Sequence, residues 1–441
     1  MSSDSDTSLE AGGPVALMRH PAWTIWSWFL LGSLLVWSNG VNNIPIPGVR
    51  APFVDAAFLG LLFYSRSHWL PFTSTAFGRR LFLMILLFDL VVGFRIVLDY
   101  PVYGIGAVRD ALLALEIWAV FLGWGLARRV GVAGVKKALS IMFGMSLAWF
   151  CLYPIQDRVV PLFPVVGVQR PTNLASFTSF GFVAAWALLW FSRRRGTNAV
   201  VGSCIAVAVI LMATARGVLA GLVLAGIVSL CANPRRQPTR TFVRLGAAAA
   251  LLLALMAILP PLPGRLGSVT PSTFVGLIES GFGEKSDVSS SYNDRQQFMS
   301  ATLEALSTTR MGYVFGVGLG RDLTGGFVAD VKITKPHNDF LEYFARLGVI
   351  GFAPWIGVWI IVFRELFRRA RADFAIARWG VAALSVSLLM CLTQPFSSFA
   401  YGGMVQWLTM GLVLGCSETP MTRVGLAGSG TGAEYASKIV A

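Results

Sequence analysis

The chain has 441 residues, of which 55% are hydrophobic and 13% charged, and its mean hydropathy of +0.66 excludes a soluble domain of ordinary composition. The formal net charge is +14, but the basic residues stand in small groups between apolar stretches, which is typical of a membrane protein and argues against a nucleic-acid partner. We therefore expect an all-α polytopic membrane protein.

Twelve apolar runs are long enough to cross, or nearly cross, a bilayer. They are Ala22–Ser38, Pro52–Tyr64, Leu81–Leu98, Ala111–Ala127, Ala138–Ile155, Leu174–Phe191, Ala199–Ala213, Gly217–Ala232, Gly246–Leu259, Phe340–Phe363, Val381–Leu392 and Phe399–Cys416. We expect residues 21–259 to form the first nine transmembrane helices and residues 337–416 the last three. The polar ends, residues 1–20 and 417–441, are interpreted as disordered tails.

Basic residues follow the even-numbered apolar runs and are scarce after the odd-numbered ones. The five basic groups are Arg66, Arg79 and Arg80; Arg128, Arg129, Lys136 and Lys137; Arg193, Arg194 and Arg195; Arg235, Arg236, Arg240 and Arg244; and Arg364, Arg368, Arg369, Arg371 and Arg378. Positive charge is retained on the cytoplasmic side of a membrane. The pattern therefore predicts that both termini and the even-numbered connections are cytoplasmic and that the odd-numbered connections face outward.

The longest connection, residues 260–336, is then a large external loop. Apolar residues at helical spacing predict a helix over Asp294–Thr309, with Asn293 or Asp294 as its N-cap. Three glycines follow at alternate positions: Gly316, Gly318 and Gly320. Because glycine permits tight turns, we expect a flexible turn that brings the loop over a site.

Three arginines, Arg170, Arg216 and Arg295, lie on the outer face against the bias in basic residues. An arginine close to hydrocarbon is costly and usually has an anionic partner or a watery cavity. The three residues are therefore candidates for an anion site. The alternative is that their side chains reach lipid headgroups.

His337 closes the external loop and opens an apolar helix, so a group with a near-neutral pKa stands where water meets membrane. The other two histidines, His20 and His68, are predicted to lie on the cytoplasmic side. His337 is therefore the candidate general base on the outer face. The alternative is a structural histidine that caps the helix after it.

Four pieces of the chain together resemble the O-antigen ligase and polymerase superfamily of bacterial inner-membrane glycosyltransferases, over roughly residues 170–363. They are Gln169–Ala175; Thr214–Gly217; Asp294-Arg295 followed by Gly316–Gly320; and the His337-Asn338 run to Gly351. One departure is Pro171-Thr172-Asn173, where the family tends to have Asn-Pro-Asn, so Arg170 is carried over with less weight.

The resemblance implies a GT-C-like fold with a periplasmic active site. It implies a donor of undecaprenyl diphosphate carrying a polysaccharide, an acceptor hydroxyl on the lipid A core, and surrounding membrane lipid. The expected activity is that of an O-antigen ligase, with an O-antigen polymerase or a protein O-oligosaccharyltransferase as alternatives. A transporter of lipid-linked sugar is the alternative from another class, but it should show an internal repeat, which the sequence lacks.

On this resemblance, His337 removes the proton of the acceptor hydroxyl, and Arg216 and Arg295 hold the departing diphosphate. Guanidinium groups match phosphate oxygens and gain strength away from bulk water. Arg170, Asn338 and Arg321 are further candidates to bind the diphosphate or the glycan. For Arg321 the ordinary alternative is a solvated loop face. A single displacement would invert the anomeric configuration.

The sequence indicates no metal and no cofactor. It has no CxxC pair and no outward DxD or ExD pair, and the Gly316–Gly320 run stands in no βαβ unit, which a dinucleotide site requires. Asp339 and Glu342 are expected to be solvated or to orient His337 and Arg346. We therefore predict a metal-independent reaction.

Overall fold

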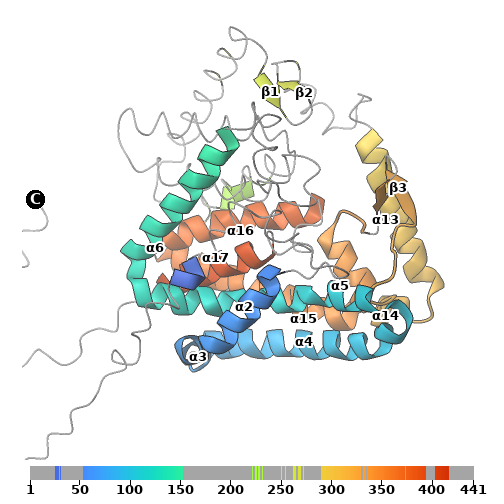
Figure 1. Cartoon of the computed structure of the whole chain (residues 1–441), viewed down its shortest axis with the longest axis horizontal. Helices are drawn as coiled ribbons and strands as arrows, with labels where there is room; N and C mark the ends of the chain where they lie inside the picture. The colour runs from blue at the N-terminus through green and yellow to red at the C-terminus, as the bar shows by residue number, and fades with distance from the viewer. Residues whose placement is uncertain are drawn as a thin grey trace, which may run out of the picture.

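The computed structural model (Figure 1) describes residues 25–28, 30, 53–151, 221, 224–225, 227–228, 231, 250, 254, 262–264, 267–269, 272, 290–328, 331–333, 335–372, 374–393 and 403–416. The long helices of this part are α2 (Phe53–Tyr64), α3 (Arg66–Thr73), α4 (Ala76–Tyr103), α5 (Ile105–Ile117), α6 (Ala119–Cys151), α13 (Ser290–Thr308), α15 (Asp339–Arg371), α16 (Ala375–Thr393) and α17 (Gly403–Cys416). A single-turn helix, α14 (Gly312–Phe315), follows α13. The predicted helical fold is confirmed in these segments.

Two antiparallel hairpins of short strands are the non-helical elements of the described chain. Strand β1 (Leu262–Gly264) pairs with β2 (Gly267–Val269), and β3 (Gly326–Val328) pairs with β4 (Val331–Ile333). Both fall in the segment predicted to be the external loop, so that loop has ordered structure of its own.

Three of the described helices, α4, α15 and α16, are long and apolar enough to cross a membrane, and α2 and α17 are shorter apolar helices. The exposed side of α4 carries large apolar residues: Leu83, Leu86, Leu87, Leu90, Phe94, Val97 and Leu98. A surface of this kind is unfavourable in water and fits contact with lipid. The protein is therefore a membrane protein, as predicted, and the count of twelve spans stays a prediction.

The helix boundaries agree with the apolar runs at most places in the described segments. One exception is α6, which continues through the predicted connection with Arg128, Arg129, Lys136 and Lys137 and is interrupted only by a non-helical Gly131 (φ 68°). Another is the predicted span Ala111–Ala127, which is divided because α5 ends at Ile117 and α6 begins at Ala119. Trp118 lies between them, and its indole N–H donates to Asp89 Oδ2 on α4 at 2.6 Å. The predicted runs between Leu174 and Leu259 lie almost entirely outside the described residues.

Helices α4 and α15 lie side by side, with α13 and α14 gathered at one end of this pair (Figure 1). Elsewhere, α6 and α17 approach so closely that a Cβ added at Gly411 would collide with the carbonyl of Val120. Small residues allow such contact between membrane helices. The end of the bundle that carries α13 and α14 also carries His337.

Candidate functional site

Helix α15 is interrupted near its start, and this interruption shapes the site. Gly348 has φ 61° and ψ −170°, so the helix breaks there and the carbonyls just before it lose their partners within the helix. Two of these carbonyls, on Ala345 and Arg346, accept hydrogen bonds from the N–H groups of Val317 (2.7 Å) and Gly318 (3.3 Å). The segment before α15 therefore satisfies the backbone groups that the break exposes.

The segment that makes these bonds is the glycine turn, residues 316–320. Gly316, Gly318 and Gly320 have φ values of 79°, 113° and 81°, which glycine adopts without strain. A Cβ at Gly316 would collide with the carbonyl of Arg346. The predicted tight turn is confirmed, and its backbone is hydrogen-bonded to α15. Its flexibility stays a prediction.

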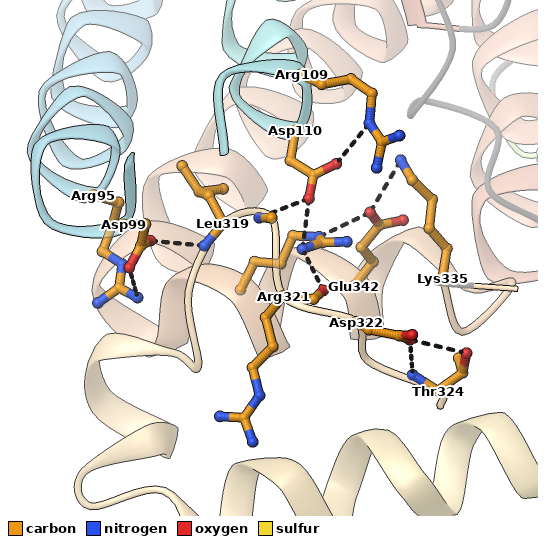
Figure 2. A network of polar contacts seen from close by, with 12 residues as sticks. Arg95, Asp99, Arg109, Asp110, Leu319, Arg321, Asp322, Thr324, Lys335 and Glu342 are labelled. Atoms are coloured by element: carbon orange, nitrogen blue, oxygen red, sulfur yellow. Dashed lines mark hydrogen bonds and ion pairs between the residues drawn. The ribbon is translucent and has the colours of Figure 1, made fainter. Parts of the chain in front are cut away.

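The glycine turn is also bonded to the N-terminal helices. The Leu319 N–H donates to Asp99 Oδ2 of α4 at 2.7 Å, and the Gly320 N–H donates to Asp110 Oδ2 of α5 at 2.9 Å. Figure 2 shows Asp99 between Leu319 and Arg95, whose Nη2 lies 3.0 Å from Asp99 Oδ1. Two carboxylates from the first third of the chain thus hold the external loop.

Next to this turn lies a network of four buried or nearly buried charges, Asp110, Lys335, Glu342 and Arg346, which we call the ion-pair network. Arg346 Nη1 lies 2.7 Å from Asp110 Oδ2, and Arg346 Nε lies 3.0 Å from Glu342 Oε1. Lys335 Nζ lies 3.2 Å from the same Glu342 oxygen. The two acids and two bases compensate one another, which buried charges require.

His337 stands directly beside this network, in the His337 turn (residues 335–338). Its φ of 54° makes it, with Met311, one of two non-glycine residues with a positive φ in the described chain. This conformation costs about 1–2 kcal/mol in an L-residue, so the surroundings must impose it. Asn338 Oδ1 accepts from the Leu341 N–H at 3.0 Å and caps α15, so the alternative in which His337 is the cap is wrong.

Helix α13 covers the other side of His337. The His337 ring stacks on Phe298, with ring centroids 6.0 Å apart and an interplanar angle of 21°. Thr302, one turn further along α13, donates to the carbonyl of Leu323 at 3.2 Å and ties the helix to the loop. Arg295 precedes Phe298 by three residues on the same helix, so its charge is brought toward His337.

The pKa of His337 reflects these neighbours. Burial of the partly exposed ring lowers the pKa below its ordinary value of 6.5, the positive charge of Arg295 lowers it further, and the negative charge of Glu342 opposes both. A histidine with a lowered pKa is neutral at pH 7. The ring can therefore accept a proton, which a general base must do.

The structure brings together some of the predicted site residues. His337 lies close enough to Arg295 for the charge of the arginine to lower its pKa, and Asn338 follows His337 with its side-chain oxygen in the helix cap. Arg321 points away from Asp110 and Glu342 (Figure 2), and its Nη1 donates to Thr309 Oγ1 at 3.1 Å. Arg170 and Arg216 lie outside the described residues.

Two expectations about the acidic residues and the loop helix need correction. Asp339 and Glu342 are fully buried, so the expectation that they are solvated is wrong. The alternative expectation was that they orient His337 and Arg346, and Glu342 does contact Arg346. Helix α13 begins at Ser290, so Asn293 and Asp294 lie inside the helix and are not its N-cap.

The ion-pair network was missed as a unit. Its signals in the sequence were Asp110, at the edge of an apolar run, and Arg346, inside one. Charged residues in such places usually have a partner. Among the described residues, no group of three or more His, Cys, Asp or Glu side chains is arranged to hold a metal ion.

Comparison with known proteins gives one match. Residues 201–356 match the family model described as O-antigen ligase, and no curated protein matches the chain. The matched segment contains α13, the glycine turn, His337 and the break in α15, which form the site. The match covers about a third of the chain and supports membership of the O-antigen ligase and polymerase superfamily.

Proposed function

We propose that the protein is an O-antigen ligase that transfers an O-antigen polysaccharide from undecaprenyl diphosphate to a sugar hydroxyl of the lipid A core. The observation that carries this proposal is the placement of His337. The ring is neutral, held between α13 and α15 in an imposed backbone conformation, and accompanied by the guanidinium of Arg295.

In the proposed reaction, a ring nitrogen of His337 takes the proton of the acceptor hydroxyl. The hydroxyl oxygen bonds to the anomeric carbon of the donor as the bond from that carbon to the diphosphate oxygen breaks. The electron pair leaves with undecaprenyl diphosphate, and Arg295 and Arg216 stabilise the charge that develops on it. One such displacement inverts the anomeric configuration, and the proton on His337 is then lost to water or to the product.

Arg295 is suited to the diphosphate because it is an exposed cation beside a base that must stay neutral. A positive charge there suppresses protonation of His337 and attracts the anionic leaving group. Both effects favour the same reaction. Arg216 and Arg170 enter the proposal through the charge pattern and the resemblance, and Arg321 is the least supported of the arginines because its side chain is directed to Thr309.

The test uses purified protein, a lipid-diphosphate glycan as donor, a lipid A core acceptor and excess EDTA. His337→Ala is expected to lower kcat by about 10²- to 10⁴-fold, since that is the usual contribution of a general base. Arg295→Gln should lose activity, and Arg310→Gln, which removes an exposed arginine of the same loop, should not. Unchanged turnover in His337→Ala rejects the base, and dependence on an added divalent ion rejects metal independence.

The acceptor decides between related activities. Product formed on the lipid A core supports the ligase. Extension of a second lipid-linked glycan, with no product on the core, would make the protein a polymerase, and product on a polypeptide would make it a protein O-oligosaccharyltransferase. Movement of donor across vesicles without any product would support transport.

A further inference from the structure

The ion pair between Lys335 and Glu342 encloses His337. Lys335 precedes the histidine by two residues and Glu342 follows it by five, so their contact at 3.2 Å closes the chain around the His337 turn. The side chain of Glu342 is 0% exposed, and that of Lys335 is 16% exposed. Figure 2 shows Lys335 reaching back from the loop toward Glu342 on α15.

Glu342 is itself fixed by the rest of the ion-pair network. The same oxygen that meets Lys335 lies 3.0 Å from Arg346 Nε, and the Arg346 guanidinium also contacts Asp110 and the carbonyl of Arg321 at 3.2 Å. The Arg346 side chain is 1% exposed. A carboxylate held by a guanidinium with so many partners has little freedom to move.

We propose that Glu342 is the positioning residue of His337: with Lys335 it closes the turn that holds the histidine in its left-handed conformation, and Arg346 and Asp110 fix the carboxylate in place. The inference rests on the proposed role of His337 as the base. It concerns how the base is held and not whether the reaction occurs.

Two other contacts are too few to impose the conformation of His337. The Asn338 cap fixes the start of α15, and the stack on Phe298 fixes one face of the ring. Neither restrains the chain before the histidine. The ion pair of Lys335 does, because it ties that side of the turn to the first turn of α15. Strained residues persist where several restraints combine.

Glu342 also acts on His337 through its charge. The charged groups that face the histidine are Arg295 from α13, Glu342 from α15 and Lys335 from the turn itself. Arg295 lowers the pKa of His337 and Glu342 raises it. Loss of the Glu342 charge therefore shifts the pKa of His337 downward, and loss of the Arg295 charge shifts it upward.

The first experiment measures this opposition without the reaction. The chain has three histidines, so labelled histidine in the full-length protein gives few NMR signals, and His337→Ala assigns the one of interest. Titration should give a lower pKa for His337 in Glu342→Gln and a higher one in Arg295→Gln. Glu304→Gln, which removes an exposed acid of α13, should leave it unchanged. An unchanged pKa in Glu342→Gln overturns the proposal.

The second experiment measures turnover. Glu342→Gln should lower kcat about 10- to 100-fold with little change in KM, because misplacement of a catalytic group by about 1 Å costs that much. The acid limb of its pH–rate profile should move to lower pH. A change confined to KM, or a kcat equal to that of Glu304→Gln, contradicts the positioning role.

If Glu342→Gln does not fold, Lys335→Gln removes the same ion pair at its less buried residue. Lys335→Arg, which keeps the positive charge, is the rescue variant. A lower kcat in Lys335→Gln that recovers in Lys335→Arg supports the role of the ion pair. Equal kcat values in the wild type, Lys335→Gln and Lys335→Arg overturn it. Failure of the proposed function would look different. The pKa shifts would then appear as expected while His337→Ala retained full turnover.

Discussion

His337 owes its chemistry to its neighbours, which come from two different helices. Phe298 and Arg295 belong to α13, and Glu342 belongs to α15. The backbone strain at φ 54° is localised to the residue that the proposed reaction uses. Strain of this kind is common at functional sites because a bound geometry is prepared before substrate arrives.

The pH dependence of the wild-type protein follows from the lowered pKa of His337. A general base works when it is neutral, and burial and Arg295 keep the ring neutral to a pH below its ordinary value of 6.5. We therefore expect the acid limb of the kcat/KM profile to fall below pH 6.5, and Arg295→Gln to move it upward. A limb that starts above pH 7 in the wild type would contradict the assignment.

The sequence singles out His337 and Arg295 as candidates because each combines a reactive side chain with an unusual place in the charge pattern. It was not sufficient to find the ion-pair network. Asp110 and Gly320 are 210 residues apart in the chain, and no local pattern reports a contact of that separation. Arg346 stands in an apolar helix and becomes intelligible only when both of its carboxylates are seen.

Helix α15 consists of two helical segments that meet at Gly348. The shorter part, Asp339–Leu347, carries Glu342 and Arg346 of the ion-pair network. The longer part is apolar until the charged residues of its last two turns. The break is enforced from outside, because a Cβ at Gly348 would collide with the carbonyl of Val314. The loop segment that occupies the break could not be predicted from the sequence, because it packs there through long-range contacts.

Substitution of Gly348 by alanine is expected to destabilise the protein by more than about 1–2 kcal/mol, since strain at φ 61° is joined by a collision. Gly104→Ala, with φ 54° and open space, should show the strain alone. Gly93→Ala, in helix α4 with open space, should stabilise by about 0.5–1 kcal/mol. Thermal unfolding in one detergent gives the order, and equal Tm values for Gly348→Ala and Gly104→Ala would argue against the collision.

The contact between α6 and α17 depends on glycines in the same way. Gly411 faces the carbonyl of Val120, and Gly123 faces the carbonyl of Leu408. Gly411→Leu should separate the helices and lower the free energy of unfolding by about 2 kcal/mol or more, as overpacking of a core does. Gly60→Leu, where nothing lies within 4 Å, is the matched control. Similar unfolding temperatures for the two variants would show that this helix contact contributes little.

Helix α13 was predicted from the sequence, but its first residue was not. The helical spacing of apolar residues predicted α13. The structure shows what two of these residues contact or fill, because Phe298 stacks on the His337 ring and Leu306 is buried. Its start was placed four residues too late, at Asp294 and not at Ser290, because polar residues in the first turn are compatible with both a cap and a helix.

For the whole molecule, the orientation in the membrane remains the main prediction. Basic groups predict that residues 260–336 face away from the cytoplasm and that the connection with Arg66, Arg79 and Arg80 faces it. A reporter enzyme that works only outside the cytoplasm should be active when fused after Arg310 and silent when fused after His68. The reverse result would place His337 on the wrong side for the proposed donor.

The matched family segment does not contain all of the site. Residues 201–356 include His337, Arg295 and Arg346, but Asp99 and Asp110 come from α4 and α5, before that segment begins. Asp110→Asn is therefore expected to lower kcat, as Glu342→Gln is, because both changes remove a carboxylate from Arg346. Arg109→Gln, a change at the 64% exposed neighbour, should have little effect on turnover.

The bonds from Asp99 and Asp110 to the glycine turn limit how this protein can be recombined with its relatives. A chimera that joins the C-terminal half of this chain to foreign N-terminal helices would inherit a buried guanidinium and two backbone amides whose acceptors had been left behind. Grafting a new sugar preference onto this scaffold should therefore transfer α4 and α5 together with the loop.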